Sequence, residues 1–174
     1  MRIAISGSHQ TGKSTLAEAL AAALPDYALI PESYYDLAGE GEPLAEMPDL
    51  DTFEQLFAAS IELLSSCDDN SILDRCPYDM LAYLVSHNES DRFELRRWLG
   101  ELQTTMQRLD LIVFVPIEAP DRIPDIDHRR LRERVDEEVR RLAMEDYLGF
   151  GVPAIEVAGS PTQRLQTVLS HIKR

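Results

Sequence analysis

The chain has 174 residues, 44% of them hydrophobic, and a formal net charge of −14. This length fits a single domain over residues 1–174, and the acidity argues against DNA, RNA or an anionic membrane as a standing partner. Cys67 and Cys76 show no metal-binding or redox spacing, and the longest apolar run, residues 111–115, is too short to span a bilayer. Because the chain opens directly on an apolar strand, we expect no signal peptide and a cytoplasmic protein.

The first predicted strand, residues 2–6, leads into a glycine-rich segment. Residues 7–14 match the phosphate-loop pattern G-x-x-x-x-G-K-[ST] at every fixed position. The Ala- and Leu-rich residues 15–24 predict the helix that must follow, and Pro25 ends it. This strand–loop–helix order favours a nucleotide site over a glycine-rich turn that matches by chance.

The residue types of this loop explain its chemistry. Glycines let the backbone N–H groups converge on phosphates at the N-terminus of the following helix. Lys13 would place a cation between the β- and γ-phosphates, and Ser14 would supply a hydroxyl ligand to Mg²⁺. We therefore expect ATP and Mg²⁺ as cofactors. The residues expected to bind them are Gly7, Ser8, His9, Gln10, Thr11, Gly12, Lys13, Ser14 and Thr15.

Residues 27–30 predict a second strand. The segment that follows, to about residue 49, is polar and punctuated by glycine and proline. Asp51 or Thr52 can cap a helix whose apolar residues recur at i, i+3 and i+4. Phe57 lies on this apolar stripe, so we expect it in the core.

A third strand is predicted over residues 71–73, and it delivers Asp74 and Arg75 at its carboxyl end. Pro77 begins a helix, and a further helix is expected over residues 91–108. Strands and helices therefore alternate through this part of the chain, as in parallel sheets with crossover helices.

Residues 111–115 form a continuous apolar run, typical of a strand buried on both faces of a parallel sheet. An arginine-dense helix is predicted from residue 128 to about residue 147. Residues 154–157 predict a fifth strand, and Pro161 begins a last helix. The pattern indicates an α/β fold with helices on both faces of a parallel sheet, where ligands bind beyond the carboxyl ends of the strands.

Charged residues are expected at this edge of the sheet. Asp74 can orient Mg²⁺ opposite Ser14, although an N-cap aspartate without function would look the same. Arg75 can clamp a phosphate or a substrate oxygen, with a surface ion pair as the alternative. Glu32 can accept the proton of a substrate hydroxyl during phosphoryl transfer, and Asp36 is an alternative base. The other interpretation is that Glu32 is a loop glutamate without function.

Aromatic residues near the same edge can form a stacking wall for a base or another flat ring. The candidates are Tyr34, Tyr35, Phe57 and Tyr78, although core packing is favoured for Phe57. The segment of about residues 120–134 is predicted to be a lid that closes arginines onto the phosphates. These arginines can equally pair with neighbouring glutamates and form a solvated charged face.

With these segments placed, the chain resembles the P-loop kinases of nucleosides, nucleotides and ribosylnicotinamide. It especially resembles small AAA-type domains similar to the kinase half of the bifunctional NAD-biosynthesis regulator. The resemblance implies a three-layer P-loop NTPase fold, with a five-stranded parallel sheet in the order 2-3-1-4-5 and a mobile, arginine-bearing lid. The segments that carry it are residues 7–14, Ile30-Pro31-Glu32, Leu73-Asp74-Arg75-Cys76-Pro77 and the arginine-rich segment.

The resemblance also implies roles for single residues. Glu32 matches the carboxylate that deoxynucleoside kinases use as a base toward the 5′-hydroxyl, and Asp74-Arg75 matches their Asp-Arg pair. Arg129 matches the lid arginine, and Arg134 is a second candidate for it. Gly159 and Ser160 match the loop that lines the adenine.

We therefore expect an ATP- and Mg²⁺-dependent kinase whose acceptor is a small-molecule hydroxyl or phosphate, such as a nucleoside, a nucleotide or a ribosylnicotinamide-like molecule. The alternative is an NTPase switch or coupling module that acts on a protein partner. A GTPase is disfavoured because the [NT]-K-x-D motif is absent from the sequence. The residues expected to be catalytic are Lys13, Glu32, Asp74, Arg75, Arg129 and Arg134.

Overall fold

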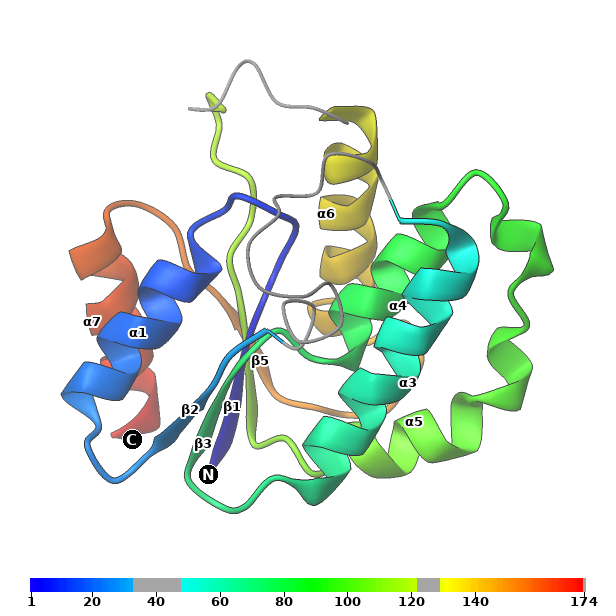
Figure 1. The fold of residues 1–174 in the computed structure, drawn as a ribbon. Helices are drawn as coiled ribbons and strands as arrows, with labels where there is room; N and C mark the ends of the chain where they lie inside the picture. Colours follow the sequence, from blue (N-terminus) through cyan, green and yellow to red (C-terminus); the bar gives the residue numbers. More distant parts are fainter. Residues whose placement is uncertain (33–47, 122–128, 174) are drawn as a thin grey trace.

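The computed structural model describes residues 1–32, 48–121 and 129–173 (Figure 1). Within these residues five strands form one parallel sheet in the order β2-β3-β1-β4-β5, as predicted. The strands are β1 (Arg2–Ser6), β2 (Ala28–Ile30), β3 (Ser71–Asp74), β4 (Leu111–Phe114) and β5 (Ala154–Glu156).

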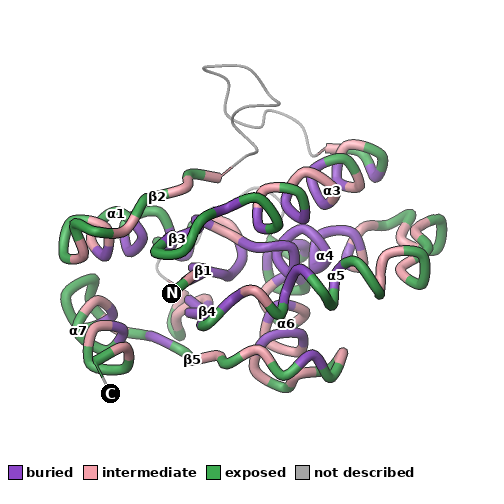
Figure 2. Tube along the Cα trace, turned by 90° about the horizontal axis from the view of Figure 1, so that it is seen from below, coloured by how far each residue is buried: buried purple, intermediate pink, exposed green. Residues whose placement is uncertain are grey.

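Helices cover both faces of this sheet (Figure 1). On one face lie α1 (Lys13–Ala23) and α7 (Pro161–Ile172), and on the other lie α3 (Leu50–Ser66), α4 (Pro77–Ser86), α5 (Leu99–Met106) and α6 (Arg129–Ala143). Alternate residues of β1 serve the two faces: Ile3 and Ile5 pack with α1, while Ala4 belongs to the core under α3 and α4. Figure 2 shows α4 as the most buried helix.

The strand register aligns the carboxyl ends of the three central strands. Ile5 of β1 pairs with Asp74 of β3, and Ser6 of β1 pairs with Phe114 of β4. The segments that leave β1, β3 and β4 therefore emerge on the same side of the sheet, at the upper ends of the strands in Figure 1. This is the edge where a parallel sheet binds ligands.

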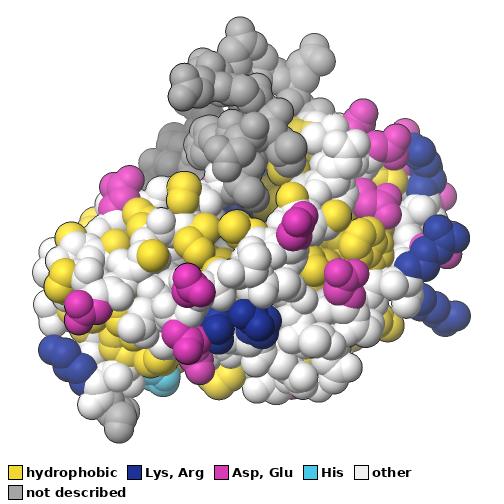
Figure 3. Space-filling model, turned by 60° about the horizontal axis from the view of Figure 1, so that its bottom comes forward, with side chains coloured by type: hydrophobic (Ala, Val, Ile, Leu, Met, Phe, Trp, Pro, Cys, Tyr) yellow, Lys and Arg dark blue, Asp and Glu magenta, His cyan; other side chains and the backbone are white. Residues whose placement is uncertain are grey.

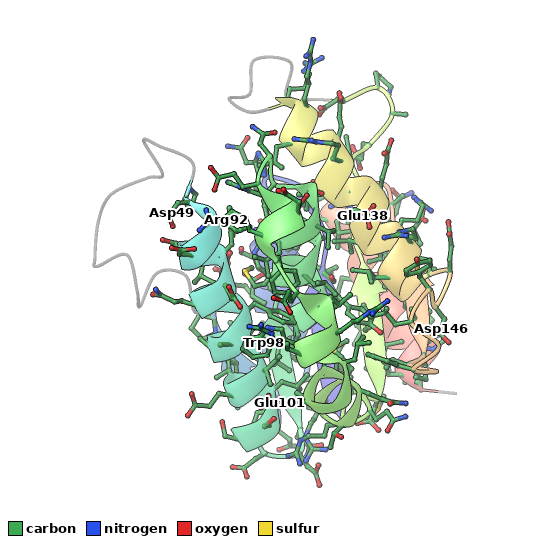
Figure 4. The ribbon with its side chains drawn as sticks, turned by 90° about the vertical axis from the view of Figure 1, so that its right-hand side faces the viewer. Asp49, Arg92, Trp98, Glu101, Glu138 and Asp146 are labelled. Carbon is green, nitrogen blue, oxygen red and sulfur yellow. The ribbon has the colours of Figure 1, made fainter. Side chains whose placement is uncertain are left out.

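The predicted helix over residues 91–108 is wrong in its first half. Short 3₁₀ turns occupy Ser90–Arg92 and Leu95–Arg97, and α5 begins only at Leu99, after Trp98 (Figure 4). Phe93 and Trp98 both contact Phe57, with ring centroids 5.9 and 5.3 Å away. Residues five positions apart lie on different faces of an α-helix, so this shared contact requires an irregular backbone.

Other boundaries differ by a few residues. The N-cap of α3 is Asp49, whose carboxylate accepts the Thr52 N–H at 2.8 Å, rather than Asp51 or Thr52. The helix predicted to reach about residue 147 ends at Ala143. Beyond it Asp146 has a φ of 47° and accepts the Phe150 N–H, which turns the chain away (Figure 4).

The opposite edge of the sheet carries mixed charge. Arg2 pairs with Asp69 at 2.7 Å, and Arg108 donates to the Leu64 and Cys67 carbonyls at the end of α3. Figure 3, in which this side comes forward, shows acidic and basic side chains next to one another. In the described part of the chain, no helix combines the length and apolarity that crossing a bilayer requires.

Phe57 tests the core on the α3 side. It is fully buried, so Phe57→Ala should lower the free energy of unfolding by about 3–5 kcal/mol through lost burial and a residual cavity. Leu29→Ala on the edge strand β2, where the side chain is 37% exposed, is the matched control and should cost about 1 kcal/mol or less. Urea denaturation of both variants measures this, and equal losses would contradict the assigned core.

Candidate active site

The glycine-rich loop connects β1 to α1 with backbone angles that favour glycine. Gly7 and Gly12 have φ values of 145° and 89°, and a Cβ at Gly7 would lie 2.4 Å from the Val115 carbonyl oxygen. Only glycine fits this approach. Gly12 is the N-cap of α1, and Ser14 and Thr15 lie exposed in its first turn. The exposed N-terminus of α1 is therefore suited to an anion.

Lys13 is buried behind this loop. Its Nζ donates to the Ser8 carbonyl oxygen at 2.6 Å. Burial, with help from the nearby Arg75 cation, lowers the pKa of Lys13 to about 7, and the carboxylates of Asp79, Glu32 and Asp74 only partly oppose this. A phosphate beside Nζ would restore the charged form, because an opposite charge raises the pKa of an ammonium group.

Asp79 is the polar anchor of the site, although sequence reasoning missed it. Its side chain is fully buried in the first turn of α4. It accepts hydrogen bonds from Ser6 Oγ at 2.7 Å, from the Gly7 N–H at 2.9 Å and from the Cys76 N–H at 2.9 Å. The bond to Cys76 is that of a capping box, so an acidic residue three positions after Cys76 was the available signal.

Arg75 and Glu32 form an ion pair beside the loop. Arg75 Nε donates to Glu32, and Nη1 donates to the Gly7 carbonyl oxygen at 3.0 Å. Burial lowers the pKa of Arg75, but Glu32, Tyr83 and Asp79 raise it by more, so the side chain stays a cation. Arg75 also has a φ of 86°, a strained conformation for a residue with a side chain.

Asp74 lies at the end of β3 and points into a small cavity. Glu32, Arg75, Leu63 and Met80 also line this cavity, which therefore has a charged side and an apolar side. In the described part of the chain, Asp74 Oδ1 is buried without a hydrogen-bond partner, which is unfavourable unless another group satisfies it.

These residues fit a Mg²⁺ ion that arrives with a polyphosphate. Asp74 Oδ1 and the Ser14 hydroxyl are oxygen donors of the type that Mg²⁺ prefers. Over residues 1–32, 48–121 and 129–173, no three His, Cys, Asp or Glu side chains gather to hold a metal by themselves. Most ligands of Mg²⁺ would then be phosphate oxygens and water, which is the usual arrangement in nucleotide sites.

An aromatic contact joins α4 to the loop through Tyr83, which the sequence analysis did not single out. The Tyr83 hydroxyl lies 3.0 Å from His9 Nδ1, and its ring stacks on Phe53 at 5.1 Å. Tyr78 is buried in the core, 6.3 Å from the Phe150 ring. Five positions separate the two tyrosines, so they lie on different faces of α4, and only Tyr83 faces the loop.

Helix α6 reaches the loop through Arg132. This side chain is 2% exposed, its Nε donates to the His9 carbonyl oxygen at 3.0 Å, and its Nη1 pairs with Asp121. The predicted lid residues Arg129 and Arg134 are exposed on the same helix. Most of the remaining lid falls outside the described residues, as do Tyr34, Tyr35 and Asp36.

The loop predicted to line the adenine, which contains Gly159 and Ser160, lies next to the phosphate loop. Arg164 of α7 connects them, because it donates to the Gly159 carbonyl oxygen at 3.0 Å and to the Thr11 carbonyl oxygen at 2.6 Å. Ser160 is the N-cap of α7, and its hydroxyl accepts the Gln163 N–H at 3.3 Å. The structure thus brings Gly159 and Ser160 to the same edge as residues 7–14.

A family profile matches most of the chain. The family profile described as AAA domain matches residues 2–164. Comparison with curated protein sequences finds no match.

Solved structures show the same fold. A deoxyadenosine kinase from M. mycoides, with dCMP and dCDP bound, is 14% identical, with a TM-score of 0.67 over 99% of this chain and 98% of that chain. Thymidylate kinase from Candida albicans is 17% identical, with a TM-score of 0.65 over 99% and 90%. YorR from Bacillus subtilis, in complex with phosphorylated GDP, is 19% identical, with a TM-score of 0.64 over 99% and 96%. The predicted P-loop kinase fold is thereby confirmed.

Lys13 gives a prediction about stability and pH. Its pKa is about 7 in the folded protein and near 10.5 in the unfolded chain, so between these values the unfolded state binds more protons. The free energy of unfolding of the wild type should then rise with pH relative to Lys13→Met, by at most about 1.4 kcal/mol per pH unit. Below about pH 7 the difference should be constant, because Lys13 is protonated in both states.

Urea denaturation of the two proteins at about pH 6, 8 and 9.5 measures this difference. Other titrating groups are shared by the two proteins, so their contributions cancel. A difference that does not change between pH 6 and 9.5 would show that Lys13 keeps its ordinary pKa in the folded protein.

Proposed function

Since this chain belongs to the AAA domain family and has the fold of P-loop kinases, we propose that it is an ATP- and Mg²⁺-dependent kinase. The acceptor would be a small molecule with a hydroxyl or phosphate group, such as a nucleoside, a nucleotide or a ribosylnicotinamide-like molecule. The main support is the Glu32–Arg75 pair, which lies beside the phosphate loop and is joined to Gly7. A base and a cation at this position suit an acceptor, whereas simple nucleotide binding requires neither.

The loop would hold the nucleotide. Backbone N–H groups at the N-terminus of α1 would bind the phosphates, and Lys13 would give up its bond to the Ser8 carbonyl to contact them. Ser14 and Asp74 would hold Mg²⁺, which neutralises charge on the transferred group. The carbonyl of Gly159 and the backbone of Ser160 would line the base.

Glu32 would act on the acceptor. In this structure it is paired with Arg75, and both line the cavity that Asp74 enters. An acceptor hydroxyl beside Glu32 would donate its proton to the carboxylate as the γ-phosphoryl group is transferred. Arg75, still held by the Gly7 carbonyl and Asp79, would orient the acceptor oxygen or bind an acceptor phosphate.

Helix α6 would supply charge during transfer. Arg132 already contacts the loop backbone at His9. Arg129 and Arg134 remain proposed lid arginines that approach the phosphates on closure. Tyr34 and Tyr35 remain proposed acceptor contacts, and a cytoplasmic location remains a prediction from the sequence.

An acceptor panel tests the proposed reaction. The protein is incubated with ATP, Mg²⁺ and one nucleoside, nucleotide or ribosylnicotinamide at a time, and products are identified by mass. We expect one acceptor to gain a phosphoryl group, and Lys13→Ala to abolish its formation. Release of free phosphate alone with every acceptor would favour an NTPase switch or coupling module instead.

Glu32→Gln tests the proposed base. The amide keeps the shape of the side chain but cannot accept the proton, so kcat should fall about 100-fold or more. The affinity for ATP should change by less than about twofold, because Glu32 is assigned to the acceptor. Glu156→Gln, at an exposed pair with Arg140, is the control and should leave kcat unchanged. A normal kcat in Glu32→Gln would remove Glu32 from the mechanism.

A further inference from the structure

Arg164 lies behind the phosphate loop although it is far away in the sequence. Its Nη1 donates to the Thr11 carbonyl oxygen at 2.6 Å, across a separation of 153 positions. Nε donates to the Gly159 carbonyl oxygen at 3.0 Å, and Nη2 pairs with Glu118 at 2.7 Å. One buried guanidinium thus connects the phosphate loop to the segments that follow β4 and β5.

The guanidinium contacts the Thr11–Gly12 peptide, whose N–H group is proposed to bind a phosphate. A Cβ at Gly12 would lie 3.1 Å from Arg164 Nη1, so the cation packs against the Thr11–Gly12 peptide. A cation bonded to the Thr11 carbonyl polarises this peptide and makes the Gly12 N–H a stronger donor. Gly12 is the N-cap of α1, where the phosphates are proposed to bind.

The contacts of Arg164 differ from those of the remainder of α7. The apolar side of α7, with Val168 at its centre, packs in the core that also contains Leu16 and Leu20 of α1. The polar head of Arg164 has its hydrogen-bond partners at the ligand edge of the sheet, and two of the three are carbonyl oxygens of loops. A fork with several donors suits this task, because it fixes direction as well as distance.

We propose that Arg164 is a positioning residue of the nucleotide site, acting through the Thr11–Gly12 peptide. It orients the Gly12 N–H toward the phosphates, adds positive charge behind the loop and fixes the loop relative to Gly159. The inference rests on the proposed nucleotide binding, and it assigns to α7 a role in affinity beyond packing.

Calorimetric titration with a non-hydrolysable ATP analogue and Mg²⁺ tests this role, because it measures Kd and binding stoichiometry separately. Arg164→Gln should raise Kd at least about tenfold, the scale of one charge-assisted hydrogen bond, with stoichiometry unchanged. Arg164→Lys keeps the charge but not the fork, and should recover part of the loss. Arg140→Gln, an arginine paired with Glu156 away from the loop, is the control and should bind like the wild type.

The calorimetric outcomes separate the possible roles. A purely structural role would lower the thermal stability or the stoichiometry of Arg164→Gln while leaving Kd unchanged, and this result would overturn the inference. The same holds if Arg164→Lys binds no better than Arg164→Gln. If Arg164→Gln binds normally while Lys13→Ala loses binding, the inference fails and the proposed function stands. If the wild type binds no nucleotide, the proposed function fails with it.

Nuclear magnetic resonance of the nucleotide-free protein provides a direct readout. The Gly12 amide proton resonance should move upfield in Arg164→Gln, because the Thr11–Gly12 peptide loses the polarising cation, and should lie between the two in Arg164→Lys. The Gly100 amide, on the exposed surface of α5, should not move. An unchanged Gly12 resonance in Arg164→Gln would contradict the coupling.

Discussion

One buried carboxylate, that of Asp79, holds the site together. It accepts hydrogen bonds from the end of β1, from the first residue of the phosphate loop and from the N-terminus of α4. A buried carboxylate is tolerated only when such bonds satisfy it, so each of these groups is held where the others require it. Arg75 also approaches Asp79, at 3.5 Å, so its ion pair with Glu32 is positioned relative to Gly7. Contacts with Asp79 therefore position both the phosphate loop and the Arg75–Glu32 ion pair.

Three carboxylates and two cations interact electrostatically around this point. The carboxylates of Asp79, Glu32 and Asp74 interact with the cationic side chains of Lys13 and Arg75. Burial lowers the pKa of Lys13 to about 7, and its Nζ donates to the Ser8 carbonyl oxygen of the same loop. A polyphosphate would recharge Lys13, and a divalent cation would satisfy Asp74. The two ligands are therefore expected to bind more strongly together than apart.

Local patterns allowed much of this protein to be predicted. The alternation of strands and helices predicted a parallel sheet, and the structure confirms it. The residues that fix the loop were missed because their partners are distant in sequence and are mostly backbone groups, which no motif records. Tyr83 shows the same limit, since the sequence does not say which face of α4 meets the loop. The missed residues are Asp79, Tyr83, Arg132 and Arg164.

The ties to the phosphate loop also set an order of assembly. Three side chains hydrogen-bond to the loop from later helices: Asp79 of α4, Arg132 of α6 and Arg164 of α7. The bonded residues are 72, 123 and 153 positions apart in the sequence. During synthesis the phosphate loop is made first and Arg164 of α7 is made much later. A long-range contact cannot form before both of its partners exist. A nascent chain that lacks α7 would contain the phosphate-loop motif, but Arg164 would not yet contribute its proposed share of the affinity for a nucleotide. With Arg164 in the proposed positioning role, tight nucleotide binding is expected only after α7 has been synthesised.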